Sequence, residues 1–220
     1  MTDFALARRN MVEGQLRPNR VTNTALLAAL GELPRERFLP DSVRSVAYAD
    51  EDVPLGGGRY LMEPMVLARL IQTLQPQPED RGLVVGAARG YGAALLARLV
   101  KAVTALESDP VLAAAGEQTT KDLGLADVQW ITGKLEQGVP GSAPYDVILI
   151  EGAVPEIPPA VLAQLRRDGG RLVTVLKRGA RVGQAVLCST AGGGRVDPHP
   201  VFDCAIPVLP MLKTAPGFVF

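Results

Sequence analysis

Two hydrophobic patterns divide the chain at a proline-bearing linker, residues 75–82. Before the linker, apolar residues recur at helical spacing, which predicts helices over residues 8–16, 25–33 and 64–74. After it, short runs of Val, Ile and Leu alternate with helical segments, as in a parallel sheet that is covered on both faces. We therefore expect an N-terminal helical and substrate-loop subdomain (1–78) followed by an α/β domain (79–220).

The second part predicts a doubly wound, mostly parallel sheet of about seven strands, which is a Rossmann-like α/β fold. The expected strands cover residues 83–85, 103–107, 128–132, 145–151, 171–176, 184–189 and 201–205. Helices are expected after the first, second and fourth of these strands, and they end near residues 99, 123 and 167. The ligand crevice of such a sheet opens at the carboxyl ends of its first strands.

Several residues mark where the predicted helices before the linker begin and end. Thr22 or Thr24 can cap the second helix, and Pro34 follows its end closely. Pro64 suits the first turn of the third helix. Residues 50–60 contain three consecutive glycines and predict a flexible loop.

Composition narrows the class of protein. The chain has 220 residues, of which 47% are hydrophobic and 21% charged, as in globular proteins. Its 23 Lys and Arg balance its 23 Asp and Glu, which argues against a protein held to nucleic acid by its overall charge. We expect neither a secretory signal in residues 1–10, which carry charge and no apolar core, nor a membrane span. We expect a cytoplasmic monomer that binds neither nucleic acid nor membrane.

The cysteines and the single histidine exclude several kinds of site. Cys188 and Cys204 are too few for a disulfide framework and predict buried, reduced, small apolar residues. His199 lies between two prolines, which disfavours a histidine-dependent catalytic triad. One histidine and two distant cysteines do not make a zinc site, so we expect no metal.

A glycine-bearing turn, residues 86–92, joins the first strand of the sheet to its helix. Glycine lets the chain turn sharply and lets a ligand approach the backbone. Glu107 ends the next strand, where an acidic side chain can accept hydrogen bonds from ribose hydroxyls. In the alternative interpretation, the glycines serve only the packing of helix on strand and Glu107 is a solvated strand end. The spacing fits the nicotinamide-type motif G-x-G-x-x-G poorly.

Six landmarks stand in order along nearly the whole chain. They are RNMVEGQL from Arg9, LPRERFLP from Leu33, AYADEDVPLG from Ala47, Gly90-Tyr91 before an alanine-rich helix, PYDVI from Pro144, and the run from Gln164 to Val173. Because these six landmarks occur in this order, the chain resembles the protein-L-isoaspartate O-methyltransferases. The resemblance implies a seven-stranded, Rossmann-like sheet that binds S-adenosylmethionine. It also implies methylation of the α-carboxyl of isoaspartyl residues, which activates that group for succinimide closure and so for repair.

The resemblance implies a site as well. Its candidate cofactor residues are Gly86, Ala88, Arg89, Gly90, Tyr91, Glu107, Ser108, Lys134 and Glu151. Glu107 would hold the ribose, and the turn would hold the methionine portion. The candidate catalytic residues Arg59, Tyr60 and Met62 would face the acceptor. The partner would be a protein or peptide that carries an isoaspartyl or other carboxylate.

Four substitutions depart from the family's pattern. Val84 and Ala88 replace an acidic residue and a glycine in the cofactor loop, and the Ala88 methyl penalises a positive φ. Met62 replaces a serine or threonine that assists the acceptor carboxylate, and Lys134 replaces an aspartate that meets the adenine amino group. These changes favour a second interpretation, in which a non-catalytic family member binds a protein partner through its crevice or its apolar tail, residues 205–220.

Purely structural roles stay open for several of these positions. Met62 can fill a gap in the core, Tyr91 can be a packing aromatic, and Trp130 is typical of a core residue rather than of a stacking platform. Residues 50–52 can be a solvated acidic loop or lie close to the substrate mouth. The apolar tail can simply cover an edge of the domain.

Overall fold

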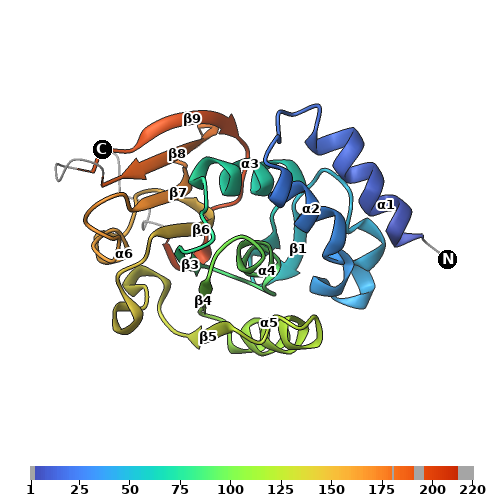
Figure 1. The fold of residues 1–220 in the computed structure, drawn as a ribbon, viewed down its shortest axis with the longest axis horizontal. Helices are drawn as coiled ribbons and strands as arrows, with labels where there is room; N and C mark the ends of the chain where they lie inside the picture. Colours follow the sequence, from blue (N-terminus) through green and yellow to red (C-terminus); the bar gives the residue numbers. More distant parts are fainter. Residues whose placement is uncertain (1–2, 180, 191–195, 213–220) are drawn as a thin grey trace, which may run out of the picture.

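A seven-stranded sheet forms the centre of the computed structural model, which describes residues 3–179, 181–190 and 196–212 (Figure 1). The strand order is β5-β4-β3-β6-β7-β8-β9, and β8 alone among these strands runs against the others. The strands are β3 (Arg81–Val85), β4 (Ala102–Glu107), β5 (Val128–Thr132), β6 (Val147–Val154), β7 (Arg171–Leu176), β8 (Gly183–Ser189) and β9 (His199–Cys204). The seven predicted strands and the Rossmann-like fold are therefore confirmed.

The central strands are buried because both faces of the sheet are covered. All eight residues of β6 are buried. Side chains alternate between the faces, so Val84 of β3 joins the larger core while its neighbours Leu83 and Val85 join a second core on the opposite face. Runs of Val, Ile and Leu satisfy both cores at once, which explains why the sequence pattern is continuous.

The predicted helices are present, and three boundaries differ, the first of them because α1 begins at Phe4 and not at Arg8. The helices are α1 (Phe4–Asn10), which continues into a π-helix, α2 (Thr24–Glu32), α3 (Pro64–Leu74), α4 (Tyr91–Ala97), α5 (Pro110–Asp122) and α6 (Pro159–Leu162). Asn23 rather than Thr22 or Thr24 caps α2, because its side chain accepts a hydrogen bond from the Leu26 N–H. The predicted helix over residues 159–167 is shorter, because residues 164–166 pair with Tyr145 instead of continuing the helix.

The glycine-rich segment is a hairpin and not the flexible loop that was expected. Strands β1 (Val53–Gly56) and β2 (Arg59–Leu61) pair antiparallel. Gly57 and Gly58 connect them at φ values of +57° and +75°, which glycine adopts without strain. Alternation along β2 buries Arg59 and leaves Tyr60 exposed, so the hairpin fixes the direction of both side chains.

The N-terminal helices share the larger core with the sheet domain (Figure 1). Arg35 is fully buried between them: its Nε donates to the Ala47 carbonyl at 2.6 Å and its Nη2 to the Met62 carbonyl at 2.7 Å. Its guanidinium carbon also lies 4.9 Å from the centroid of the Tyr91 ring at the start of α4. The division of the chain at residue 78 stays a prediction.

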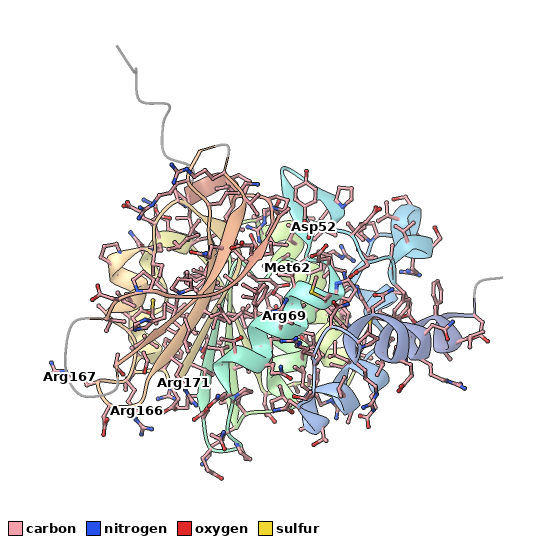
Figure 2. The ribbon with its side chains drawn as sticks, turned by 90° about the horizontal axis from the view of Figure 1, so that it is seen from above. Asp52, Met62, Arg69, Arg166, Arg167 and Arg171 are labelled. Atoms are coloured by element: carbon pink, nitrogen blue, oxygen red, sulfur yellow. The ribbon has the colours of Figure 1, made fainter. Side chains whose placement is uncertain are left out.

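Helix α3 is held against the far edge of the sheet as well. Arg69 lies on α3 (Figure 2), and its guanidinium carbon is 3.7 Å from the centroid of the Phe202 ring on β9. This cation–π contact adds to the seven buried residues that hold α3 in place.

Candidate functional site

The turn after β3 has the tight conformation that its glycines predict. Gly86 and Gly90 have φ values of +77° and +92°. A methyl group added to Gly90 would lie 2.7 Å from the Trp130 ring, so this glycine also serves packing. Trp130 is partly buried and donates from Nε1 to Thr120 Oγ1 at 3.1 Å, which confirms the packing role predicted for it.

Ala88 lies in the same turn at a φ of +50°, and its side chain is buried. The strain of a non-glycine residue there is about 1–2 kcal/mol. Ala88→Gly relieves it, whereas the neighbouring buried Ala87→Gly loses the same methyl group without that relief. We expect Ala87→Gly to lower the free energy of unfolding more than Ala88→Gly does. The difference between the two variants should be about 1–2 kcal/mol, measured by urea denaturation. Equal losses would contradict the strain.

Glu107 is fully buried at the end of β4, so the alternative of a solvated strand end is wrong. Its Oε2 accepts from Arg59 Nη2 and from the Ala88 N–H, each at 2.7 Å. Its Oε1 accepts from the N–H groups of Ser108 and Asp109 at 2.8 and 3.0 Å, and from Ser108 Oγ at 3.1 Å. Three donors fill Oε1, and Arg59 and the Ala88 N–H take both acceptor positions of Oε2, so a ribose hydroxyl can bind Oε2 only where Arg59 leaves.

Arg59 faces this carboxylate rather than the acceptor side, which corrects its expected direction. Its side chain is 5% exposed, and Nη2 donates to the Gly86 carbonyl at 2.9 Å as well as to Glu107. A buried carboxylate needs a compensating charge, and Arg59 supplies it from the hairpin. The other two guanidinium nitrogens, Nε and Nη1, are buried and have no hydrogen-bond partner among the described residues.

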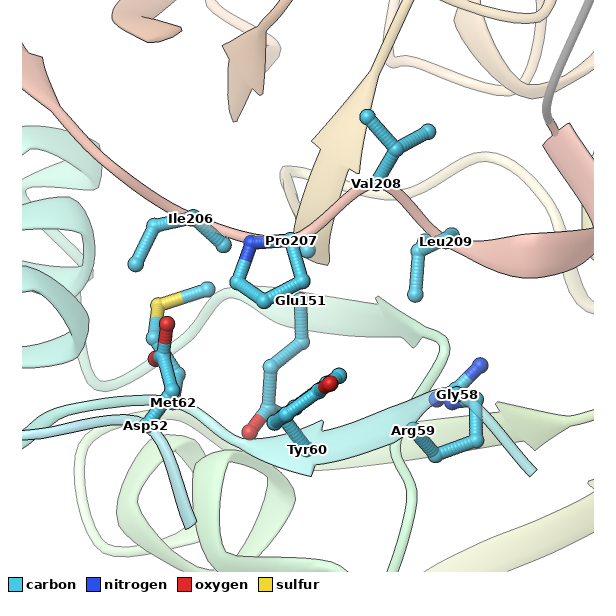
Figure 3. Close-up of a pocket in the computed structure, with 11 residues that line it drawn as sticks. Asp52, Gly58, Arg59, Tyr60, Met62, Glu151, Ile206, Pro207, Val208 and Leu209 are labelled. Atoms are coloured by element: carbon cyan, nitrogen blue, oxygen red, sulfur yellow. The ribbon is translucent and has the colours of Figure 1, made fainter. Parts of the chain in front are cut away.

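A C-terminal strap, defined as residues 206–209, crosses the carboxyl end of β6 (Figure 3). Two backbone hydrogen bonds fix it: the Ala153 N–H donates to the Pro207 carbonyl at 3.0 Å and the Leu209 N–H to the Ala153 carbonyl at 2.9 Å. A methyl group added to Gly86 would lie 3.3 Å from both Leu209 methyl carbons, so Leu209 covers the glycine turn. This part of the apolar tail is therefore a cover. The predicted partner-binding end, residues 218–220, lies outside the described residues.

The hairpin, the end of β6 and the strap surround a narrow cavity (Figure 3). Its lining residues are Asp52, Gly58, Arg59, Tyr60, Met62, Glu151, Gly152 and the strap. Only about 20 Å³ of it is open to the centres of water molecules, which is room for about one water. S-adenosylmethionine is far larger, so this cavity does not hold the cofactor in this conformation.

Glu151 points into the cavity from β6 and is 4% exposed. Both carboxyl oxygens lack a hydrogen-bond partner among the described residues. Burial raises the pKa of the Glu151 carboxyl to about 8, although Arg59 and Arg35 act in the opposite direction. At neutral pH this side chain is therefore mostly uncharged, which lowers the cost of its burial.

Tyr91 and Met62 take structural positions. The Tyr91 ring is fully buried and meets the Phe38 ring edge-on, with centroids 5.3 Å apart. Burial raises the pKa of Tyr91 to about 12. Met62 is 2% exposed, and it also lines the cavity. Asp52 lies at the same cavity, where its Oδ1 accepts from the Glu63 N–H at 2.9 Å.

Two candidates lie away from the cavity. Arg89 turns toward the N-terminal helices, where its Nε donates to the Phe38 carbonyl at 3.1 Å. Lys134 is exposed in the loop after β5. The residues that sequence reasoning missed are Arg35 and Leu209: the first is a charged residue inside an apolar motif, LPRERFLP, and the second belongs to the apolar tail.

Over residues 3–179, 181–190 and 196–212, no group of three or more His, Cys, Asp or Glu is arranged to hold a metal ion. Within the same ranges, no helix combines the length and the apolar character that a membrane span requires. Cys188 and Cys204 are buried free thiols, as predicted, and burial raises the pKa of each to about 11.

The strand order reverses between β3 and β6, and the glycine turn lies at that switch point, where open α/β sheets bind ligands. This topology, with one antiparallel strand beside the sheet edge, is that of the Rossmann-like class of methyltransferases. The profile of one family in that class, Protein-L-isoaspartate(D-aspartate) O-methyltransferase (PCMT), matches residues 7–194. The chain therefore belongs to the protein-L-isoaspartate O-methyltransferase family.

Relatives support this over most of their length. The protein-L-isoaspartate O-methyltransferase of Koribacter versatilis (strain Ellin345) is 36% identical over 204 residues, which cover 93% of this chain and 90% of the relative. That of Methanoregula boonei (strain DSM 21154 / JCM 14090 / 6A8) is 38% identical over 188 residues, which cover 86% and 85%.

Solved structures agree in fold. One protein-L-isoaspartate O-methyltransferase superposes with a TM-score of 0.80 at 25% identity, and the match covers 92% of this chain and 65% of that longer one. A Plasmodium falciparum protein described as the same enzyme, in complex with S-adenosyl-L-homocysteine, gives a TM-score of 0.75 at 16% identity and covers 97% and 99%. At that identity the second comparison supports the fold alone.

Proposed function

We propose that the protein is a cytoplasmic, S-adenosylmethionine-dependent carboxyl methyltransferase that acts on isoaspartyl or related carboxylates of proteins and peptides. The observation that carries the proposal is the match of the family model over residues 7–194, which includes the glycine turn and Glu107 at the switch point. The Ala88 N–H of the glycine turn donates to Glu107 Oε2 at 2.7 Å, so turn and acid form one unit. Membership of the family supplies the chemistry that such a unit supports.

In this proposal Glu107 meets the ribose and the turn over residues 86–90 holds the methionine portion. Tyr60, exposed at the rim of the cavity, and Met62 face the acceptor. Both roles require Arg59 and Leu209 to leave their present positions.

The test begins with calorimetric titration of S-adenosylhomocysteine. A Kd below roughly 100 μM, about −5.5 kcal/mol, supports the enzyme. An isoaspartyl peptide incubated with S-adenosylmethionine should then form a base-labile methyl ester that releases methanol. The matched peptide with a normal aspartyl linkage is the control and should release none. Cofactor binding without ester formation would indicate a different acceptor.

A second candidate function is favoured by the filled crevice. A non-catalytic family member that binds a protein partner does not need room for a cofactor, and here Arg59 and Leu209 occupy that room. The absence of any binding of S-adenosylhomocysteine, by the native chain and by the opened variants described below, would favour this candidate.

A further inference from the structure

We infer that Arg59 is an internal competitor of the cofactor and that the C-terminal strap holds it in place, so that cofactor binding requires the strap to lift. This inference rests on the proposed function, because it assigns the closed crevice to a state that precedes binding. In this inference the cavity is too small for the cofactor because the chain closes its own crevice.

Arg59 uses the hydrogen-bond acceptors that a bound nucleoside would need. Its Nη2 donates to Glu107 Oε2 at 2.7 Å and to the Gly86 carbonyl at 2.9 Å. One group belongs to the proposed ribose site and the other to the turn proposed for the methionine portion. A ligand that takes either acceptor must therefore displace the guanidinium.

Leu209 closes the remaining space. Methyl groups added to Gly86 and Gly152 would lie 3.3 Å and 2.5 Å from atoms of its side chain, so Leu209 packs directly on both glycines. Its side chain points toward Arg59, whereas the side chain of Val208 points away (Figure 3). Leu209 itself is 4% exposed. The strap therefore shields the ion pair from water, which strengthens the pair.

The strap is well suited to detach without unfolding the sheet. It is attached to β6 by a single isolated bridge with two hydrogen bonds at Ala153, and Lys177 Nζ donates to the Ile206 carbonyl at 3.4 Å. The apparent affinity for a ligand falls in proportion to the fraction of molecules in the open state. Changes that favour the open state should therefore raise affinity without adding any contact to the ligand.

Three variants test this by calorimetric titration with S-adenosylhomocysteine. Arg59→Gln removes the competitor, and Leu209→Ala removes the cover. We expect each to lower the Kd about tenfold or more relative to the native chain. Val208→Ala is the matched control, because it shortens the neighbouring strap residue whose side chain points away from Arg59, and its Kd should stay within about twofold. Thermal unfolding checks that every variant is folded.

Hydrogen exchange gives a second readout that does not depend on the variants. Ligands usually protect the amides of their binding site. If the strap lifts, saturating S-adenosylhomocysteine should instead speed exchange of the Leu209 and Ala153 amides, whose hydrogen bonds hold the strap. The amides of Gly86 and Ala87 in the turn donate to the Leu106 carbonyl of β4, and they should stay protected.

The outcomes separate the two proposals. If the native chain binds and both opened variants bind no more tightly, or if the Leu209 amide stays protected in the complex, the strap does not gate the crevice and the proposed function stands. If neither the native chain nor any variant binds, both proposals are wrong. Tighter binding by Arg59→Gln and Leu209→Ala but not by Val208→Ala supports both.

Discussion

Glu107→Gln is expected to lower the free energy of unfolding by about 3–5 kcal/mol, the scale of removing one partner from a buried ion pair. The amide keeps the shape of the side chain but places an NH₂ group among five donors, so some of them lose their acceptor. It also leaves the guanidinium of Arg59 buried without its compensating charge. Urea denaturation of the two proteins measures the difference.

The double variant Glu107→Gln with Arg59→Met is the control for this prediction. It removes both charges, so the unpaired guanidinium disappears and part of the loss should return. A loss below about 1 kcal/mol in the single variant, or no recovery in the double variant, would show that the pair does not hold the turn together.

Glu151→Gln is expected to stabilise the protein progressively as the pH rises. Burial raises the pKa of this carboxyl from 4.5 to about 8 in the folded protein. Between these values the folded state keeps a proton that the unfolded state releases, so the stability of the native chain falls as the pH rises through this window. The amide does not titrate, and its advantage should reach on the order of 3 kcal/mol by pH 8.

Urea denaturation at pH 5, 6, 7 and 8 gives the slope for each protein. Glu63→Gln is the comparison, because partial burial raises the pKa of Glu63 to about 7. Its substitution should remove a decline of similar slope that ends near pH 7, and should leave the decline between pH 7 and 8 intact. A difference between native and Glu151→Gln proteins that does not change with pH would mean that Glu151 is not buried as described.

The fold could be predicted because most of its elements carry their own signals. Pro64 marks the first residue of α3, and the strands carry continuous apolar runs because both faces of the sheet are buried. The two largest errors in the fold arose where long-range pairing decides the outcome. Residues 164–166 meet Tyr145, and the glycines of residues 56–58 make a hairpin turn although glycine alone also suits a loop.

The site could be predicted only in part. Glu107 was found because it ends a strand next to a glycine turn, a relation that the chain order reveals. Its partner Arg59 lies 48 residues away, and only packing of the hairpin determines that the guanidinium turns inward. Leu209 belongs to an apolar tail whose pattern predicts burial but not the surface that it covers.

The core that the N-terminal helices share with the sheet limits how the molecule can move. A rigid-body separation of the two parts would expose that apolar core to water and would remove the contact of the Arg35 guanidinium with the Tyr91 ring. A domain-scale hinge between the two parts is therefore energetically disfavoured, and access to the interior falls to short surface segments that can detach one at a time.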